Sequence, residues 1–284
     1  MQIEYDPSRD ALYHPERRDT VFENGASYSL EQLAVEAARL AYFRAETANS
    51  ERLRLTESLS HVGFDAPTLF TDSATGSEAF ATRRPSDATT LIAFRGTQPD
   101  DVADLGTDLR ANTVPWPESG GRVHAGFAAA ARSLIPQMRD WIEVTQPDLS
   151  KMILTGHSLG AALATLSASV WPSASVVTIG SPRVGDADFA GTLGATNILR
   201  LVNCCDVVTE VPPPLGGYVH VRPSAYITAG GQREPNPTPD FIAQDRQRAR
   251  LDYVLQYAWR IGSVLVRDLA DHAPINYVRA LFPK

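Results

Sequence analysis

The sequence is poor in cysteine, and its two cysteines, Cys204 and Cys205, are adjacent in a chain of 284 residues. Neighbouring cysteines rarely bridge, because a disulfide needs two separated, facing Cβ atoms. A disulfide framework is therefore excluded. No third cysteine and no histidine stands at the spacing of a metal site, so neither a metal nor a redox role is expected for the pair.

A surplus of basic residues and a long apolar run are also missing. Lys and Arg number 26 against 33 Asp and Glu, and the formal net charge of −7 argues against nucleic acid or an anionic membrane as the main partner, since either would favour a basic face. No uncharged stretch reaches the length of a membrane span, which excludes stable membrane insertion and leaves only transient contact with a lipid interface. The first residues, Met1–Asp6, carry neither a basic start nor an apolar run. We therefore expect a cytoplasmic protein, with export by another route as the alternative.

The composition suits one large α/β domain. Hydrophobic residues make up 43% of the chain and charged residues 21%, which is ordinary for a globular protein and enough for a sizeable core. Short apolar segments alternate with helical ones after residue 89, which predicts a mainly parallel sheet with helices on both faces. We expect a single domain over residues 1–284, with 1–28 as an irregular N-terminal arm. The expected strands are 69–71, 77–82, 89–95, 151–155, 175–179, 197–203 and 218–221, and the expected helices are 29–42 (with a capping box at Ser29 and Gln32), 49–60, 100–109, 127–144, 159–166 and 241–268.

The segment 151–166 carries the strongest functional motif. A short, partly β-branched apolar run predicts a buried strand, and the Ala- and Leu-rich residues that follow predict a helix. Between them stands Gly156-His157-Ser158-Leu159-Gly160, the Gly-x-Ser-x-Gly pattern of a nucleophile elbow. Such a turn is strained, and side chains at both glycine positions would strike the neighbouring helix and strand. The motif predicts Ser158 as a nucleophile at a helix N-terminus, where free N–H groups and the helix dipole favour an oxyanion.

A serine nucleophile needs a histidine base, and in chains with this elbow the order is Ser, then Asp or Glu, then His. Only His220 and His272 come late enough in the sequence. His220 falls inside the alternating segment 218–221, where its side chain would lie on a sheet face, so structural packing is the better interpretation. His272 stands in a loop before a proline, the kind of position from which catalytic groups are presented. We predict His272 as the base.

The carboxylate is expected directly after a strand, at the same edge of the sheet. Asp206 has this position, and it would hold His272 in the right tautomer and stabilise the imidazolium that forms. Asp186 and Asp188 follow the preceding strand and suit a helix start, and Glu210 comes four residues after Asp206. These three acids are the alternatives to Asp206.

The oxyanion of an acyl-transfer reaction needs two hydrogen-bond donors. The N–H of Leu159, the residue after the nucleophile, is one, and the second usually comes from the loop after an earlier strand. The strand 89–95 leads through Gly96 to Thr97, which offers a backbone N–H and a hydroxyl. We predict Leu159 and Thr97 as the oxyanion hole, and this chemistry requires no metal or cofactor.

Five sequence blocks, in order along the chain, resemble those of the class 3 (fungal-type) lipases. They lie between about residues 89 and 278 and consist of Phe94-Arg95-Gly96-Thr97, Val123-His124-Ala125-Gly126-Phe127, Thr155 to Ala161, Asn203 to Asp206 with Val211-Pro212-Pro213, and Asp271-His272 with Tyr277. The resemblance implies an α/β-hydrolase fold with Ser158, Asp206 and His272 as a catalytic triad, and Thr97 and Leu159 as oxyanion donors. It also places the lid of the family at residues 98–121. His124 cannot be the base by chain order and is interpreted as structural.

The expected activity is that of a serine carboxylic-ester hydrolase, a lipase or esterase that forms an acyl-enzyme. Its partner is then a small-molecule or lipid ester, of the acylglycerol type or with short or medium acyl chains. Phospholipase A1 or galactolipase activity with the same machinery is one alternative. A catalytically inactive α/β-hydrolase that serves as a binding module is another, but a binding module has no use for an intact Ser, Asp and His set.

Apolar residues in three places bear on contact with lipid. The lid segment sets few apolar residues among Asp100, Asp101, Asp104 and Asp108, which predicts weak activation at lipid interfaces. Trp116, between two prolines, is either a lipid-facing anchor or a rigid surface contact. The expected helix 241–268 carries an apolar stripe that either packs in the core or covers the acyl pocket: Leu251, Val254, Leu255, Ala258, Ile261, Leu265 and Leu269.

Overall fold

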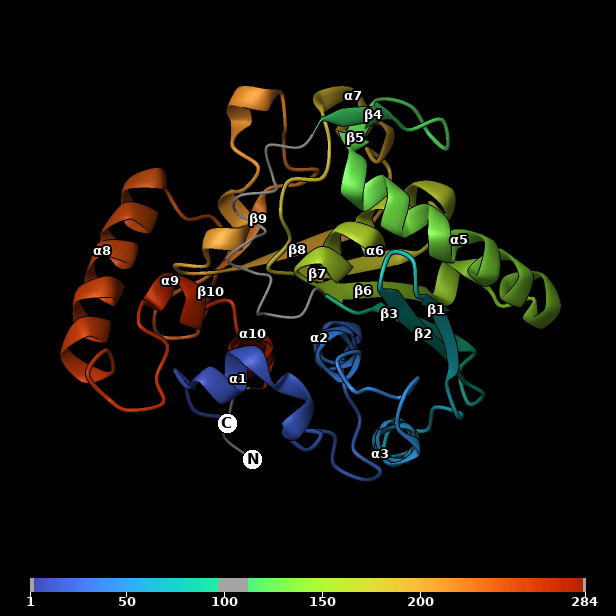
Figure 1. The fold of residues 1–284 in the computed structure, drawn as a ribbon, viewed down its shortest axis with the longest axis horizontal. Coiled ribbons are helices and arrows are strands. Elements are labelled where there is room, and N and C mark those ends of the chain that lie inside the picture. The colour runs from blue at the N-terminus through green and yellow to red at the C-terminus, as the bar shows by residue number, and fades with distance from the viewer. Residues whose placement is uncertain (1–2, 97–111, 283–284) are drawn as a thin grey trace.

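The computed structural model describes residues 3–96 and 112–282 of the chain. In these residues eight strands form one sheet, in the spatial order β1-β2-β3-β6-β7-β8-β9-β10 (Figure 1). The strands are β1 (Thr68–Asp72), β2 (Ser77–Arg84), β3 (Thr89–Phe94), β6 (Met152–His157), β7 (Ser175–Ile179), β8 (Ile198–Asn203), β9 (Ser224–Ile227) and β10 (Arg233–Glu234). A separate antiparallel pair is formed by β4 (Thr113–Pro115) and β5 (Arg122–His124).

Five neighbouring strands, β3, β6, β7, β8 and β9, run parallel through the middle of the sheet. β6 is buried along its whole length, as a parallel strand covered on both faces must be. β1 and β2 form an antiparallel hairpin at one edge, and β10 pairs antiparallel with β9 at the other. The predicted mainly parallel sheet is confirmed, together with the hairpin and the strands expected at 89–95, 151–155, 175–179 and 197–203.

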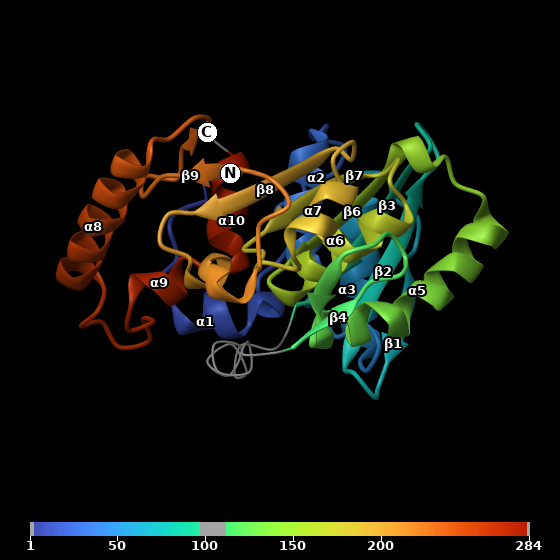
Figure 2. The same ribbon diagram turned by 90° about the horizontal axis from the view of Figure 1, so that it is seen from above.

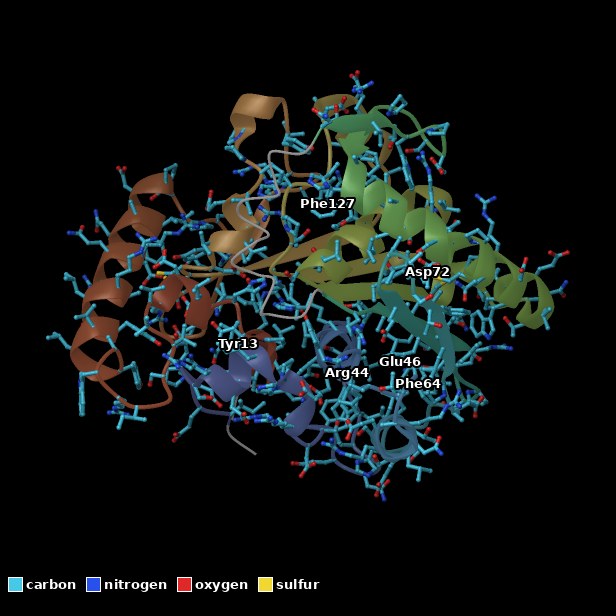
Figure 3. All side chains as sticks on the ribbon, in the orientation of Figure 1. Tyr13, Arg44, Glu46, Phe64, Asp72 and Phe127 are labelled. Carbon is cyan, nitrogen blue, oxygen red and sulfur yellow. The ribbon has the colours of Figure 1, made fainter. Side chains whose placement is uncertain are left out.

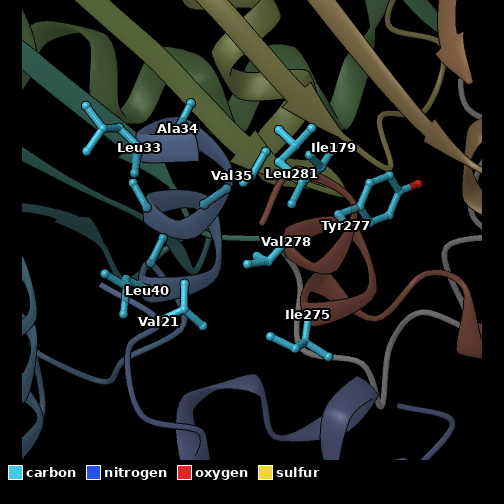
Figure 4. Packing of buried hydrophobic residues seen from close by; sticks show 14 of the residues in the cluster. Val21, Leu33, Ala34, Val35, Leu40, Ile179, Ile275, Tyr277, Val278 and Leu281 are labelled. Carbon is cyan, nitrogen blue, oxygen red and sulfur yellow. The ribbon is translucent and has the colours of Figure 1, made fainter. Parts of the chain in front are cut away.

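Helices cover both faces of the sheet, and the alternation of side chains along each strand divides the core in two. In β3, Leu91 and Ala93 belong to a cluster with α2 and α10, whereas Ile92 and Phe94 belong to a cluster with α5 and α6. Figure 4 shows apolar side chains of α2 and α10 facing one another within the first cluster. The helices are α2 (Leu30–Leu40), α3 (Asn49–Ser60) and α10 (Pro274–Leu281) on the first side, and α5 (Ala125–Thr145) and α6 (Leu159–Val170) on the second (Figure 1).

The predicted capping box begins α2. Ser29 Oγ accepts a hydrogen bond from the Gln32 N–H, and Gln32 Oε1 accepts one from the Ser29 N–H. Gln32 Nε2 also donates to the carbonyl oxygen of Leu281 at 2.8 Å. The start of α2 is thereby tied to the end of α10, the helix that follows His272 in the chain.

The N-terminal segment is more regular than the sequence predicts. Residues 1–28 are expected to be an irregular arm, but α1 (Arg9–Tyr13), capped by Ser8, and a 3-10 turn (Pro15–Arg17) lie within them. The Asp6 N–H donates to Asn276 Oδ1 at 2.9 Å, and Asn276 Nδ2 donates to the Asp6 carbonyl oxygen at 2.8 Å. The N-terminal segment is thus only partly irregular; the sequence does not reveal α1, because this helix is too short to show periodicity and is held by contacts distant in sequence.

Two elements after residue 210 also differ from the prediction. Residues 218–221 make only an isolated bridge, from Val219 to Gly185, and β9 pairs with β8 instead. The helix expected over 241–268 divides into α8 and α9, and the Gly262 φ of 89° between them is incompatible with a continuous helix. The remaining elements are α7 (Ala187–Thr192), α8 (Pro239–Gln256), α9 (Arg267–Ala270) and 3-10 turns at Leu149–Lys151, Val207–Glu210 and Pro214–Gly216.

Two features bear on the contact with lipid. Trp116 is 0% exposed, and its indole Nε1 donates to Ser169 Oγ at 2.8 Å, so both surface interpretations of this residue are wrong. Within residues 3–96 and 112–282, none of the helices combines the length and the apolar character needed to cross a bilayer.

Candidate active site

The carboxyl ends of β6, β7 and β8 bring the candidate residues to one edge of the sheet. Ser158 directly follows β6, Gly180 directly follows β7, and Asp206 comes shortly after the end of β8. These three strands are parallel neighbours, so their carboxyl ends lie side by side. His272 comes from the connection between α9 and α10, and its imidazole meets Asp206 at the same edge.

Ser158 lies on the strained turn that the elbow motif predicts. Its φ of 58° and ψ of −124° fall outside the regions that L-residues favour. A Cβ on Gly156 would lie 2.3 Å from the Gly160 backbone, and a Cβ on Gly160 would lie 2.2 Å from the Phe94 carbonyl oxygen. Only glycine permits this close approach of β6, α6 and β3, so the position of Ser158 depends on both glycines.

His272 and Asp206 form a buried hydrogen-bonded pair. His272 Nδ1 lies 2.9 Å from Asp206 Oδ2 and 3.0 Å from Oδ1. Because a carboxylate can only accept, Nδ1 carries a proton, and Nε2 of the neutral imidazole is left as a proton acceptor. This is the tautomer that a general base for a serine hydroxyl needs.

Asp206 is held by two further donors. The Tyr277 hydroxyl donates to Asp206 Oδ2, and the Val208 N–H donates to Oδ1 at 2.9 Å. Burial, with the charge of Asp206 adding to it, raises the pKa of Tyr277 well above its usual value, so the phenol remains a donor. Figure 4 shows the Tyr277 ring beside the apolar cluster with its hydroxyl pointing away from it.

Two polar atoms at this edge lack partners. Ser158 Oγ and His272 Nε2 are both buried, and neither is hydrogen-bonded to any group in the described part of the chain. Buried polar atoms normally have partners, so unpaired ones call for a functional explanation. The Ser158 N–H donates to the Ile179 carbonyl oxygen at 3.1 Å, and a Cβ on the next residue, Gly180, would lie 3.0 Å from His272 Cε1. Hydrogen bonds between catalytic groups often tighten only when substrate is bound.

A second buried histidine positions His272. His157 Nε2 donates to the His272 carbonyl oxygen at 2.7 Å, and the two imidazole centroids lie 4.3 Å apart. Burial, and to a lesser degree the neighbouring His272, lowers the pKa of His157 well below its usual value. The ring of His157 is therefore neutral, and it serves to hold the backbone of His272.

The segments that carry Asp206 and His272 are fastened to each other. Asn203 Nδ2 donates to the carbonyl oxygen of Asp271 at 3.0 Å, and the Cys205 N–H donates to Asp271 Oδ2 at 2.9 Å. Each bond joins the segment from the end of β8 to Asp206 with the residue before His272. The spacing of acid and base is thus set by backbone contacts as well as by their own hydrogen bond.

One cluster in the described residues has the composition of a metal site. The ligand atoms of Cys204, Cys205 and Asp271 all lie within 4.8 Å of one another. The Asp271 carboxylate is already paired with Arg267 Nε at 3.1 Å, and Cys204 Sγ donates to Asp245 Oδ2 at 3.3 Å. With a guanidinium beside the carboxylate, this cluster is a poor site for a cation, and the thiols join β8 to α8.

The other histidines that the sequence singles out do not meet a carboxylate at this edge. His220 Nε2 donates to the Thr209 carbonyl oxygen at 2.9 Å. Burial, together with the charges of Arg200 and Arg183, lowers the pKa of His220 to about 3. His124 caps α5, because its Nδ1 accepts a hydrogen bond from the Phe127 N–H at 3.4 Å. Both residues therefore have structural contacts of their own.

The alternative acids are likewise engaged elsewhere. Asp186 Oδ1 accepts from the Phe189 N–H at 2.9 Å and so caps α7, and Asp188 lies in the first turn of that helix. Glu210 Oε1 accepts from Arg246 Nη2 at 2.8 Å at the surface. Of the four acids considered, Asp206 is the one that the structure brings to a histidine.

One of the two predicted oxyanion donors lies in the described residues. Leu159 is the first residue of α6, so its N–H belongs to the turn that has no intrahelical acceptor. No acceptor in the described ranges is hydrogen-bonded to it, and the helix dipole adds positive partial charge there. Thr97 lies outside the described residues, as do the helix expected at 100–109 and most of the lid expected at 98–121.

Three supporting side chains were not assigned a role from the sequence. His157 and Tyr277 stand within the motifs, and a polar ring inside an apolar segment is a signal that a partner is needed. Tyr42, whose hydroxyl lies 2.7 Å from His157 Nδ1, shares the helical spacing of its apolar neighbours. Nothing in the sequence around Tyr42 marks it as different from a core aromatic residue.

Comparison with known proteins gives consistent similarities. Residues 91–216 match the family described as lipase (class 3). A lipase of Rhizopus niveus is 32% identical over 180 residues, which cover 57% of this chain and 45% of that protein. A chloroplastic phospholipase A1 of Arabidopsis thaliana is 34% identical over 153 residues, which cover 43% of this chain and 33% of that protein. The chain therefore spans less than half the length of these curated relatives.

The similarity extends to solved structures. The structure of a triacylglycerol lipase, whose catalytic centre is reported to be a serine protease triad, superposes with a TM-score of 0.57 at 25% identity. The superposed region covers 70% of this chain and 77% of that one.

Proposed function

We propose that the chain, which is similar to class 3 lipases of the α/β-hydrolase fold, is a serine carboxylic-ester hydrolase. In this proposal Ser158 is the nucleophile, His272 the general base and acid, and Asp206 the residue that orients His272. One observation carries it: Ser158 Oγ and His272 Nε2 are buried and have no hydrogen-bond partner among the described residues, while the other nitrogen of His272 is held by Asp206. These are the two atoms between which a serine hydrolase transfers a proton.

The first half of the reaction follows from the tautomer of His272. Its free Nε2 accepts the hydroxyl proton of Ser158 as Oγ attacks the ester carbonyl carbon, and Asp206 stabilises the resulting imidazolium. The carbonyl oxygen becomes an anion, which the Leu159 N–H and the N-terminus of α6 stabilise, with Thr97 as the proposed second donor. When the tetrahedral intermediate collapses, the alcohol leaves with the proton from Nε2, and the acyl group stays on Ser158.

The second half repeats these steps with water. His272 Nε2 accepts a proton from a water molecule whose oxygen attacks the acyl carbon, and a second oxyanion forms at Leu159. Collapse of this intermediate breaks the bond to Ser158 Oγ, which regains its proton from His272. The products are an alcohol and a carboxylic acid. Each proton passes among serine, histidine, water and the leaving group, so the proposed cycle needs no cofactor.

The proposed substrates are acylglycerol-type lipids and esters with short or medium acyl chains. A second candidate is the acyl ester of a phospholipid, which the similarity to a plant phospholipase A1 favours. Ser158 and His272 are each 1% exposed, so both reacting side chains are buried. Mass spectrometry of the products from triacylglycerol, diacylglycerol and phosphatidylcholine would distinguish the two classes.

A fluorophosphonate probe tests the activity itself, because it reacts covalently with an activated serine. We expect one label on the wild-type chain and none on Ser158→Ala, with hydrolysis of a soluble p-nitrophenyl ester lost in parallel. Labelling that persists in Ser158→Ala would assign the nucleophile elsewhere. A folded wild-type chain that takes no label would instead favour the binding module, the alternative without catalysis.

We also propose that residues 1–284 act as one domain. Asp6 is bonded to Asn276, and Tyr5 OH donates to Asp271 Oδ1 at 2.9 Å, so the first residues of the described chain contact the segment that carries His272. Limited proteolysis should therefore leave no independently stable N-terminal fragment.

A further inference from the structure

The outer side of α8 and the loop after it concentrate exposed apolar side chains. Of the twelve large hydrophobic residues exposed in the described part of the chain, eight lie between residues 241 and 266. α8 stands at the edge of the molecule in both ribbon views (Figures 1 and 2), and side chains project outward from it in Figure 3. Six of the eight lie between residues 251 and 265 and are called here the apolar ridge: Leu251, Val254, Leu255, Trp259, Ile261 and Leu265.

Helix geometry directs the ridge away from the protein. Ala249 and Tyr253 are the buried residues of α8, and they mark the side that packs on the rest of the chain. At about 100° per residue, Leu251 points about 180° away from the midpoint of those two residues. Leu251 and Leu255 are 60% and 75% exposed. Packing in the core and covering of the acyl pocket are therefore both wrong for the exposed members of the predicted stripe, whereas Ala258 and Leu269 pack against the apolar cluster with α2 and α10.

The loop after α8 holds its apolar tip in a fixed place. The Tyr253 hydroxyl donates to the Val264 carbonyl oxygen at 2.7 Å, and the Val264 N–H donates to the Pro7 carbonyl oxygen at 2.8 Å. Trp259 and Ile261, at the tip, are 71% and 106% exposed. A large apolar patch on a hydrogen-bonded backbone, and not on a loose terminus, indicates a contact surface for something outside the chain.

Cationic side chains accompany the ridge. The Arg260 guanidinium lies over the rings of Tyr257 and Trp259, at 5.0 and 5.6 Å from their centroids, and has no carboxylate partner in the described residues. Arg248, about one turn before Leu251 in α8, is also exposed and has no ion-pair partner in the described residues. The exposed Asp252 lies one turn after Arg248. In a chain of net charge −7, an unpaired arginine beside the apolar tip favours a negatively charged partner.

We infer that the apolar ridge docks the protein on an anionic phospholipid surface. A convex ridge of aliphatic residues with a tryptophan at its tip fits the boundary between head groups and acyl chains. Arg260 and Arg248 can keep their charged ends among anionic head groups while their stems cover apolar surface. The inference rests on the proposed function, since an enzyme for lipid esters meets its substrate at such a surface. Along the described chain, α9 is the one helix between the ridge and His272.

Vesicles of ether-linked phosphatidylcholine and phosphatidylglycerol test this inference, because ether lipids cannot be hydrolysed and binding is thereby separated from catalysis. We expect the full chain to float with these vesicles and the tryptophan emission, to which the exposed Trp259 contributes, to shift to shorter wavelength on binding. The double variant Trp259→Ser/Ile261→Ser should lower the partition coefficient at least about tenfold, because it removes the two most exposed large side chains of the tip. Arg260→Glu should weaken binding to vesicles with phosphatidylglycerol more than to phosphatidylcholine alone.

The matched control is Leu53→Ser/Val144→Ser, on α3 and α5, where the exposures are 70% and 85%. It should bind like the wild type, and all variants should hydrolyse a soluble ester at the wild-type rate. If the proposed function is wrong, no chain hydrolyses the ester and the vesicle result is unaffected. A wild type that does not float, an equal loss in the control, or a dimer that the ridge variant dissociates in sedimentation would each overturn the lipid-docking inference.

Discussion

The hydroxyl of Tyr42 donates to Nδ1 of His157 across 2.7 Å, although the two residues are 115 positions apart in the chain. The hydrogen bond that the other ring nitrogen of His157 makes shows which of the two groups is the donor. His157 Nε2 faces the carbonyl oxygen of His272, which can only accept, so Nε2 carries the proton and Nδ1 is the acceptor. Tyr42, just after the end of α2, thus reaches the backbone of His272 through one neutral imidazole.

Tyr42→Phe should destabilise the protein and slow the reaction without weakening substrate binding. The buried Nδ1 of His157 loses its donor, which should lower the free energy of unfolding by about 1–3 kcal/mol. Since Tyr42 acts through His157 on the position of His272, we expect kcat for a soluble ester to fall while KM is unchanged. Urea titration and steady-state kinetics measure the two effects. Tyr13→Phe, a partly buried tyrosine with no hydroxyl partner in the described residues, is the control; an equal loss there would contradict this role.

Asp206→Asn should reduce kcat by about 10⁴-fold while the circular dichroism spectrum stays that of the wild type. An amide in place of the carboxylate no longer fixes the Nδ1–H tautomer of His272 or stabilises its imidazolium. Asp186→Asn is the matched control, because asparagine also caps a helix and should preserve the start of α7. If the control variant is the inactive one and Asp206→Asn is mild, the acid has been assigned to the wrong residue.

Tyr277→Phe should lower activity less than Asp206→Asn does. Asp206 keeps His272 and the Val208 N–H but loses the phenol donor, and a hydrogen bond to a charged group contributes about 1.5–3 kcal/mol. We expect a lower free energy of unfolding together with a lower kcat, again by urea titration and kinetics on a soluble ester. A variant with wild-type kinetics would show that the phenol serves the fold alone.

Stability should depend on pH through Glu78. Burial raises the pKa of Glu78 to about 7, with Arg95 opposing and Glu46 adding to the shift. In the folded state this carboxyl therefore holds its proton to higher pH than in the unfolded chain, where its usual value of 4.5 applies. Its contribution to stability is present below about pH 4.5 and is lost as the pH rises through about 7.

The measurement is urea titration at several pH values between about 5 and 8. The free energy of unfolding of the wild type should fall over this range, and Glu78→Gln, which cannot ionise, should flatten the decline. Glu118→Gln changes a carboxylate that pairs with Arg132 near the surface, and it should leave the decline as in the wild type. A Glu78→Gln profile that parallels the wild type would refute the assignment.

Local chemistry made much of the fold predictable. The capping box at Ser29, the helix at Asn49–Ser60 and the parallel strands each follow from propensity and period within a short window. The site candidates Ser158, Asp206 and His272 came from a motif and from chain order, and the structure brings the last two into contact. Propensity and periodicity within a short window predict an element correctly where its conformation does not depend on partners distant in the chain.

The errors share a different cause. The apolar stripe on α8 is visible in the sequence, but periodicity does not say which side of a helix meets the protein, and Leu251 faces outward. The alternation at 218–221 predicts a strand, yet Val219 finds only an isolated bridge, because β9 already pairs with β8. Trp116, between two prolines, is predicted to lie at the surface, but it is fully buried. Each case depends on partners distant in the chain.

The bonds from Asn203 and Cys205 to Asp271 have a consequence for how such a chain can change. These bonds join the two ends of the interval between Cys205 and Asp271, which contains α8. The length of this interval therefore adds little to the free-energy cost of bringing Asp206 and His272 together, because doubling the length of a loop costs only about 0.6 kcal/mol in closure entropy. The part of this interval outside β9 and β10 can therefore vary in length or sequence while the reacting groups keep their spacing. Replacing it would give the protein a new outer surface without a new catalyst, which makes this interval a natural place for grafting.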